Sequence, residues 1–503
     1  MTVDSLKRLF CRQSYTSWLS WILVVSYVAP WIVLYFMYSW ALLFYPYEWE
    51  PGEGSKILYA LHIVRGLPLY SSNQTFPMLG NCYPPLYPLT LAPFVALGGP
   101  LLIWGRLVSL LAIIGTLILL FCIARRSTGS SFFGLISAGC FVYPASISCW
   151  YSLARMDSLC CFLQILTAYI IVRSKSIHGA ILAGVTAILA IYTKQTAVIV
   201  ITPLACYYIF QKNWKNTAVY FLTIGVIGSG IYIMMEHITY GWFHKNLFDE
   251  NVHRLFFWFR YKIFFGWFFR QNLPVLIAAS ISLIFFLKKR KNIISIWIFL
   301  GGFANAILIA ANGSGMNYFF VLWAGVSLLF AESFSILANR MVNRLKFSSY
   351  TCSCILIGLM ISLQLINYAF LPNEIFYRHT LYDFIPTEND LRSCQRLEAY
   401  IRVSASPIFV DRFPSIAIRH GKNDYYVEPA LIQELYYAGK WDPLPLVKQV
   451  EKKNFATIFM LHQSLMPKPF KDAVAENYRL VAEIPVGTFE IWRRRSIFVL
   501  EPK

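Results

Sequence analysis

The sequence predicts a polytopic α-helical membrane protein with about eleven transmembrane helices and a C-terminal extracytoplasmic α/β domain. Hydrophobic residues make up 57% of the chain and charged residues only 14%, whereas soluble domains contain about 25% charged residues. Apolar runs of about 18–25 residues, long enough to cross a bilayer, recur over the first three quarters. Charged residues become frequent after residue 371. We therefore expect a membrane domain at 1–371 and a soluble domain at 372–503.

Basic clusters between the apolar runs predict the orientation of the helices. Lys and Arg mark the cytoplasmic ends of transmembrane helices, and they gather here at residues 7–12, 125–126, 173–175, 212–215, 288–291 and 340–346. The predicted spans cover about residues 18–44, 100–124, 131–149, 156–172, 177–193, 196–210, 217–236, 273–287, 292–311, 317–335 and 349–370. The N-terminus is then cytoplasmic and the C-terminal domain lies outside.

The distribution of charge indicates whether the basic residues contact the lipid bilayer or a nucleic acid. The net charge is +19, of which the C-terminal domain contributes +2 and residues 1–371 contribute +17. Most of this excess lies in the short cytoplasmic clusters, as orientation in a membrane requires. We therefore predict contact with the lipid bilayer and no binding of nucleic acid.

The first outer loop, residues 45–99, carries the strongest signal for a functional site. Residues 1–371 contain only nine carboxylates, and Glu48, Glu50 and Glu53 lie within six residues directly after the first apolar run. Carboxylates at a membrane boundary are costly to desolvate and mark functional sites. Pro51 and Gly52 keep Glu50 and Glu53 off one regular helix, but a turn can bring them together.

Either Glu50 or Glu53 can serve as a general base. The alternative is that both ionise in solvent and pair with Lys56 or Arg65, and we expect Glu48 to be merely solvated. Residues 55–64 predict a short helix along the membrane interface. A second, shallow helix is predicted at 85–97, after a rigid aromatic-proline turn that begins at Tyr83.

The same topology places further polar residues on the outer side. Arg155 and Asp157 lie at the outer end of the fourth span, where they either neutralise each other or hold an anionic substrate. Lys194 lies between two apolar runs, where it either snorkels to the interface or binds a phosphate. His244 and Asn317 are weaker candidates.

Residues 237–272 combine basic and aromatic side chains. This composition is typical of a segment in contact with lipid headgroups. The segment serves either as a surface anchor or as a groove that guides an anionic lipid.

The C-terminal residues predict strands near 407–410, 455–461, 480–485 and 496–500, and helices near 390–402, 428–438 and 443–453. No nucleotide-binding or hydrolase motif occurs there. We expect this domain to cap the outer face.

Short motifs in a fixed order resemble a known superfamily. They are Gly66–Tyr70 (GLPLY), Tyr83–Leu89 (YPPLYPL), Gly105–Ser109 (GRLVS), Ala154–Asp157, Thr193–Gln195, Gly241–His244, Gly315–Phe319 and Trp441–Pro443. This chain resembles the GT-C superfamily, in the family 39-like branch with protein O-mannosyltransferases and lipid A aminoarabinose transferases. It departs in having Glu where many relatives have Asp in the acidic loop, and fewer predicted spans than the thirteen often found.

The resemblance implies an integral-membrane glycosyltransferase of GT-C type. Such an enzyme moves a sugar from a polyprenyl-phosphate donor to an extracytoplasmic acceptor, which is a glycan, a lipid or a protein, by inverting single displacement. Glu50 or Glu53 would be the base. The residues expected to hold the donor are Arg65, Tyr83, Arg155, Asp157, Lys194, His244 and Asn317.

Three points stay open on the sequence. No metal-binding cluster is visible, although a divalent cation between carboxylate and phosphate is an alternative. The rival functions are a lipid-linked substrate flippase or transporter and a noncatalytic scaffold subunit of an envelope glycan assembly. We expect the protein in a bacterial inner membrane, with the active site outside.

Overall fold

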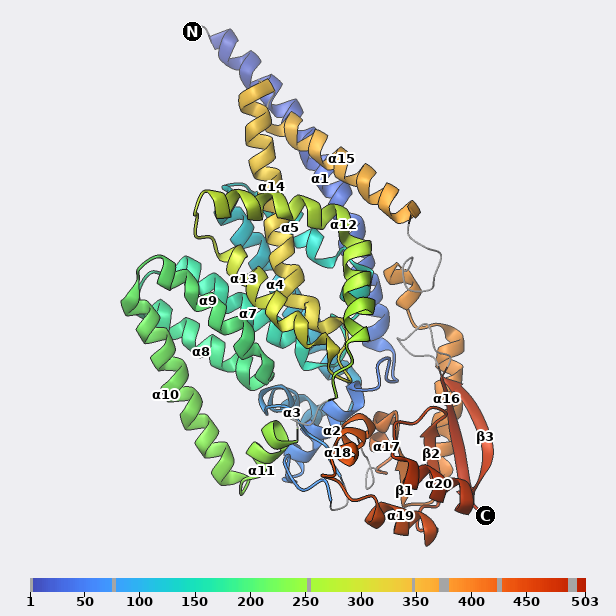
Figure 1. Ribbon diagram of the computed structural model, residues 1–503. Coiled ribbons are helices and arrows are strands. Elements are labelled where there is room, and N and C mark those ends of the chain that lie inside the picture. The colour runs from blue at the N-terminus through green and yellow to red at the C-terminus, as the bar shows by residue number, and fades with distance from the viewer. Residues whose placement is uncertain are drawn as a thin grey trace.

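The computed structural model describes residues 3–74, 78–250, 255–345, 349–370, 380–422, 428–486 and 495–503. Figure 1 shows a bundle of long helices with a small α/β domain at one end, and the N-terminus lies at the opposite end from this domain. Cys82 and Cys394 form no disulfide bond with each other.

Each of the eleven predicted spans contains a helix. These are α1 (Val3–Phe44), α4 (Leu102–Thr128), α5 (Ser131–Val142) with α6 (Ala145–Ser148), α7 (Met156–Arg173), α8 (Ile177–Thr193), α9 (Val198–Phe210), α10 (Trp214–Ile238), α12 (Phe259–Lys288), α13 (Ile294–Ala306), α14 (Phe320–Leu345) and α15 (Ser349–Phe370). Among the described residues, six helices are long and apolar enough to cross a membrane: α1, α4, α7, α10, α12 and α14 with its preceding turn. The chain therefore has the helices of an integral membrane protein, and the number of eleven spans stays a prediction.

Helix α14 forms the centre of the bundle. In its most apolar window 89% of the residues are buried, against 6% in α10, which lies at the edge of the bundle in Figure 1. Helix α13 packs closely on α14 because Gly302 leaves no side chain in the way: a Cβ there would lie 2.3 Å from the Leu322 nitrogen. Small residues bring helices together in this manner when lipid supplies no hydrophobic drive.

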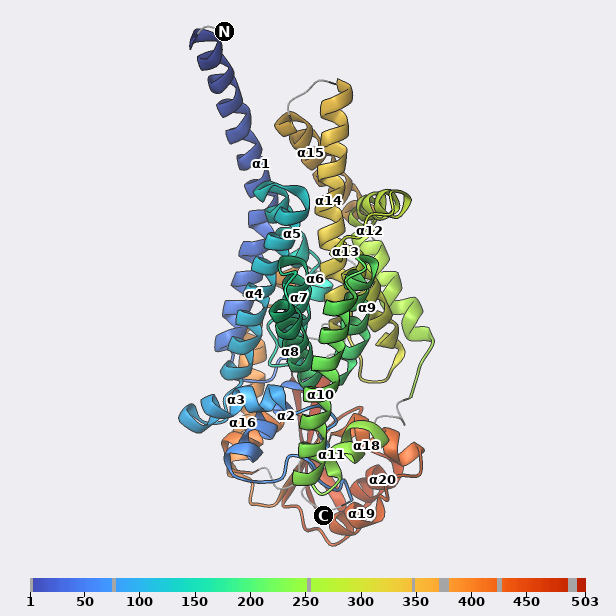
Figure 2. The ribbon, with the colours of Figure 1, turned by 90° about the vertical axis from the view of Figure 1, so that its left-hand side faces the viewer.

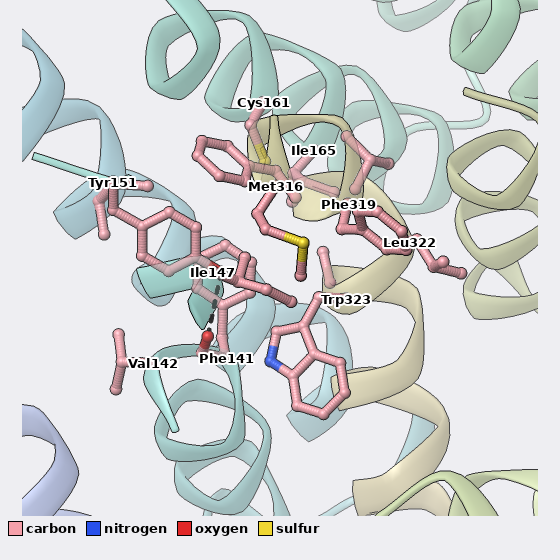
Figure 3. Close-up of a cluster of buried hydrophobic side chains, with 14 of the residues drawn as sticks. Phe141, Val142, Ile147, Tyr151, Cys161, Ile165, Met316, Phe319, Leu322 and Trp323 are labelled. Atoms are coloured by element: carbon pink, nitrogen blue, oxygen red, sulfur yellow. Dashed lines mark hydrogen bonds between the residues drawn. The ribbon is translucent and has the colours of Figure 1, made fainter. Parts of the chain in front are cut away.

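A cluster of buried apolar side chains joins α5, α7 and α14 (Figure 3). Trp323 is fully buried, and its indole N–H donates to the Cys140 carbonyl at 2.9 Å. The hydroxyl of Tyr151 donates to the Phe141 carbonyl at 3.1 Å. Every buried polar atom of these rings thus finds an acceptor, as a desolvated core requires. Because Tyr151 precedes Arg155 and Met316 precedes Asn317, this cluster supports the residues of the candidate site.

The first outer loop folds into two short helices at the end of the bundle nearest the α/β domain (Figure 2). Helix α2 spans Glu53–Val64 and α3 spans Leu86–Gly98, close to the predicted bounds. Helix α11 (Trp242–His244) lies at the same end. In the described part of the interfacial segment, aromatic rings are exposed, among them Phe256 (50%) and Trp258 (75%), which fits a surface that meets lipid headgroups.

The C-terminal residues form a four-stranded sheet of order β1-β2-β4-β3. Its strands are β1 (Ile408–Val410), β2 (Thr457–Leu461), β3 (Tyr478–Val486) and β4 (Arg495–Pro502), and its helices are α16 (Glu388–Val403), α17 (Pro414–Arg419), α18 (Pro429–Tyr437), α19 (Leu444–Glu451) and α20 (Lys468–Asn477). β1 pairs with β2 in parallel, and the other pairs are antiparallel. The predicted strands are all present, whereas α17 and α20 were not expected. The boundary at 371/372 stays a prediction, because residues 371–379 lie outside the described part.

The outer loop and the C-terminal residues share their cores. Met78 packs into the core around Phe409 and Phe470, and Ile418 packs against α2. Hydrogen bonds continue the contact: Tyr47 donates to Glu398 at 2.6 Å. The loop that carries the acidic residues is therefore held between the helical bundle and the α/β domain.

Candidate active site

A buried ion pair between Glu53 and Arg106 holds the acidic loop to the helical bundle. Arg106 of α4 contacts the Glu53 carboxylate at 2.8 Å, and both side chains are at most 1% exposed. The same guanidinium donates to the carbonyls of Leu42, Tyr45 and Tyr47. One arginine thus connects the end of α1, the loop and the start of α2.

The geometry separates the roles of the two candidate bases, because every acceptor position of Glu53 is taken. Oε1 accepts from Arg106 Nε and from the Ala154 N–H at 2.8 Å, and Oε2 accepts from Arg106 and the N–H groups of Trp49 and Glu50. Burial alone would raise the pKa of Glu53, but Arg106 and these N–H groups bring it below its ordinary value. Glu53 therefore lacks a free lone pair for taking a proton, and the geometry favours Glu50.

Glu50 keeps one carboxylate oxygen free. Its Oε2 accepts from the Gly52 N–H at 2.8 Å and from Arg155 at 2.7 Å, whereas Oε1 has no hydrogen-bond partner among the described residues. The side chain is 13% exposed. Gly52 permits this approach, since a Cβ there would lie 2.5 Å from the Arg155 guanidinium. Glu50 is thus oriented through one oxygen and accessible through the other.

Asp157 connects three of the predicted residues. Its Oδ1 accepts from Lys194 at 2.7 Å and from Asn317 at 2.8 Å, and its Oδ2 accepts from Arg155 at 3.3 Å. These residues come from the start of α7, the end of α8 and the turn before α14, which the fold brings to one point. Because Arg155 also contacts Glu50, the predicted convergence of the acidic loop with Arg155 and Lys194 is present in the structure.

Aromatic rings line the cationic side of this cluster. The Lys194 ammonium lies 4.0 Å from the Tyr318 ring centroid, and Arg155 lies 5.9 Å from the Trp150 ring centroid. Tyr83 interacts electrostatically with both Arg155 and Lys194. Such rings stabilise cations in desolvated places.

Two predicted residues are not brought to the cluster. Arg65 is exposed at the far end of α2, about 18 Å from its start at 1.5 Å per residue. His244 of α11 bonds to the Tyr232 hydroxyl at 2.6 Å and contacts Asp249 at 3.4 Å. The structure gives neither residue a contact with Arg155 or Lys194.

The expectation that Glu48 is solvated is wrong. Glu48 is fully buried, one oxygen accepts from the Ser415 N–H at 2.7 Å, and the other has no partner among the described residues. Burial raises the pKa of Glu48 to about 8. The error arises because Ser415, which covers the carboxylate, follows it by 367 residues.

Sequence reasoning also missed two buried cations. Arg106 lies inside the GRLVS motif, and it is the only charged residue between Arg65 and Arg125. A lone arginine within an apolar run is a signal for a buried partner. Lys56 was considered only as a solvent-exposed partner of the acids, but it is 3% exposed.

The structure also bears on metal binding. In the part of the chain that is described, no group of three His, Cys, Asp or Glu side chains could hold a metal ion. The cluster instead contains the free carboxylate oxygen of Glu50 and the two cations Arg155 and Lys194, which Asp157 orients.

Comparison with known proteins identifies the fold. The crystal structure of ArnT from Cupriavidus metallidurans superposes in its apo state with a TM-score of 0.59, at 12% identity over 97% of this chain and 98% of that chain. ArnT bound to undecaprenyl phosphate gives 0.56, at 11% identity over 95% and 97%. The archaeal oligosaccharyltransferase AglB from Archaeoglobus fulgidus, in complex with an inhibitory peptide and a dolichol-phosphate, gives 0.52, at 12% identity over 88% and 69%.

The sequence adds a second line of evidence. The family model described as dolichyl-phosphate-mannose-protein mannosyltransferase matches residues 83–239. Residues 83–239 of this chain are thus similar to that family, and the chain has the fold of ArnT and AglB. No curated protein sequence matches the chain. The resemblance to the GT-C superfamily that the short motifs indicate is therefore confirmed by this family model and by the fold.

The Glu53–Arg106 pair gives a stability prediction for this protein. Glu53→Gln leaves Arg106 buried without a counter-charge, which costs about 3–5 kcal/mol. We expect thermal unfolding of the detergent-solubilised variant at a clearly lower temperature than that of the wild type. Glu50→Gln is the control, since Glu50 is partly exposed and its loss leaves the buried pair intact. Equal melting temperatures for Glu53→Gln and wild type would contradict the structural role of Glu53.

Glu48 gives a prediction about pH. Its pKa in the folded protein, about 8, lies above the ordinary value of about 4.5, so the folded state holds the proton more tightly than the unfolded state. This contribution to stability is complete at low pH and is lost as the pH rises towards 8. Glu48→Gln imitates the protonated form. We expect its melting temperature to exceed that of the wild type at pH 8, with the difference vanishing near pH 5; a pH-independent difference would refute the assignment.

Proposed function

We propose that this protein is a glycosyltransferase that moves a sugar from a polyprenyl-phosphate donor to an extracytoplasmic acceptor with inversion. The observation that carries the proposal is the free Oε1 of Glu50, held by Gly52 and by the same Arg155 that Asp157 connects to Lys194. A base and a pair of cations thus lie side by side, which is the arrangement that a single displacement at a sugar phosphate requires.

The proposed step has a simple balance of bonds and charge. The acceptor hydroxyl or amine gives its proton to Glu50 Oε1 as its lone pair forms a bond to the anomeric carbon. The bond between that carbon and the phosphate oxygen breaks, and the lipid phosphate leaves with the electron pair. Attack from the face opposite the leaving group inverts the anomeric centre. Arg155 and Lys194 would stabilise the phosphate as its charge grows.

Two features support a lipid-linked donor. The cationic cluster lies at the ends of apolar helices: Arg155 precedes α7, Lys194 follows α8 and Asn317 lies just before α14. A phosphate at this level can stay near the interface while its polyprenyl chain lies among the helices. Structures with the same fold have been solved with undecaprenyl phosphate and with dolichol-phosphate.

The position of the cluster also weighs against a flippase. A transporter places its charged groups near the middle of the membrane, in broken helices of paired repeats. Here the polar residues lie at helix ends, on the side that the α/β domain covers. The acceptor would approach the free face of Glu50 from this side, beneath the C-terminal residues.

The decisive experiment uses the purified full-length protein and a panel of polyprenyl-phospho-sugars, with sugar release or transfer followed by mass spectrometry. We expect Glu50→Gln to lower turnover by about 10²–10⁴-fold, the usual contribution of a general base. Binding of undecaprenyl phosphate should persist, because the substitution releases Arg155 from its ion pair.

The matched control is Glu483→Gln, which changes an exposed carboxylate on β3 and should leave turnover unchanged. Turnover of Glu50→Gln at the wild-type rate would refute the proposed base. Absence of any release or transfer by the wild type across the panel would count against the proposed activity itself.

Lys194 provides the test of the donor phosphate. We expect Lys194→Met to weaken binding of undecaprenyl phosphate about tenfold, or about 1.4 kcal/mol, since it removes a desolvated cation and leaves Asp157 to neutralise Arg155. Ligand-dependent thermal shifts in detergent measure the affinity. Lys440→Met removes an exposed lysine of the α/β region and serves as the control. Unchanged affinity in Lys194→Met would exclude the assigned role.

A further inference from the structure

Lys56 is a buried cation beside the proposed site that the mechanism above does not use. It lies in the first turn of α2, three residues after Glu53, and only 3% of its surface is exposed. Its charge interacts with those of Glu50 and Arg155. The side chain therefore belongs to the same desolvated region as the proposed base.

Lys56 makes no close ion pair in the described part of the chain, although the charge of Glu428 acts on it from a greater distance. The ammonium donates to the Ser55 hydroxyl at 3.0 Å and lies 4.6 Å and 4.8 Å from the ring centroids of Tyr83 and Tyr59. Among the described residues, no carboxylate oxygen lies within 4.0 Å of it.

An arrangement of this kind is unfavourable for stability. A desolvated ammonium without an ion-pair partner costs free energy, which neighbouring rings only partly offset. Burial, helped by Arg155, lowers the pKa of Lys56 to about 8, although Glu428, Cys82 and Glu50 act in the opposite direction. The cation is thus retained at neutral pH at the expense of stability, which points to a ligand that supplies a close negative charge.

Tyr83 indicates where that ligand would lie. Its ring contacts Lys56, and the same residue interacts electrostatically with Arg155 and with Lys194. Three cations, contributed by α2, by the start of α7 and by the end of α8, therefore interact with one aromatic side chain. We propose that Lys56 is a third cation of the donor site and binds the phosphate of the polyprenyl-phosphate donor together with Arg155 and Lys194, an inference that rests on the proposed function.

The charge balance of the site supports this assignment. Without Lys56, two cations face the two carboxylates of Glu50 and Asp157, and the cluster is neutral. Lys56 adds a positive charge beside this neutral cluster, and its strongest opposite charge, Glu428, forms no ion pair with it within 4.0 Å. As the sugar departs, the phosphate becomes a monoester and gains a second negative charge, so a third cation stabilises the transition state more than the bound donor.

The test measures binding of undecaprenyl phosphate to the full-length protein in detergent, by ligand-dependent thermal shift, for wild type, Lys56→Met, Lys56→Arg and the control Lys440→Met. We expect Lys56→Met to bind about tenfold more weakly and Lys440→Met to bind as the wild type does. Without ligand, Lys56→Met should melt at the same temperature as the wild type or higher, because it loses an uncompensated charge.

A pH series separates Lys56 from the other groups that titrate in this range. Wild-type affinity should fall as the pH rises from 7 to 9 and Lys56 loses its proton, and Lys56→Arg should retain more of it, because arginine stays charged. Glu48 and the lipid phosphate are present in both proteins, so the difference between the two profiles reports on Lys56. Inorganic phosphate at the same concentration should give no shift, since it lacks the polyprenyl chain.

The results that overturn the inference differ from those that overturn the proposed function. Wild-type affinity in Lys56→Met, or a lower melting temperature in that variant with no loss of affinity, would reduce Lys56 to a structural residue while the proposed function stands. An equal, Lys56-dependent shift with inorganic phosphate would exclude the lipid-linked donor as its ligand. Failure of the wild type to bind any polyprenyl phosphate would remove both proposals.

Discussion

The structure depends above all on the buried ion pair between Glu53 and Arg106. Desolvating two charges is expensive, and here the cost is offset because every acceptor of the carboxylate is used and the guanidinium also donates to three carbonyls. The pair fixes both sides of the candidate site at once. Glu53 accepts a hydrogen bond from the N–H of Glu50, the proposed base. It also accepts one from the N–H of Ala154, which directly precedes Arg155, the cation that contacts Glu50.

Stability thus requires a carboxylate whose oxygens are all hydrogen-bonded, Glu53, whereas the proposed chemistry requires one with a free oxygen, Glu50. Glu53 stabilises the fold because it has no unsatisfied oxygen, and for the same reason it cannot accept a proton from a substrate. Glu50 is held through one oxygen only, and Lys56 is buried without a close ion pair among the described residues. Unsatisfied polar groups are costly in a folded protein and collect where a ligand will satisfy them. Their position next to Arg155 is therefore the strongest structural argument for a site here.

Much of this arrangement follows from the sequence, because hydropathy and the placement of basic residues determine which loops share a side of the membrane. That reasoning places Glu50, Arg155 and Lys194 on the same side of the membrane. It failed where burial depends on distant residues: Glu48 is covered by Ser415, and His244 turns to Tyr232 instead of the cluster. Helix α17 has only six residues, too few for a periodic pattern, so the element that carries Ser415 gave no signal.

The C-terminal residues do more than cover the outer loop, because they also hold it in place through packing and hydrogen bonds. Met78 lies in their core, Tyr47 donates to Glu398, and the Trp441 indole donates to the Asn73 carbonyl at 2.8 Å. The loop that bears Glu50 is therefore packed on both sides, by Arg106 from the bundle and by the sheet domain from outside. A base held in this manner needs little reorganisation when the donor binds, which is the condition under which fixed charges are most effective in catalysis.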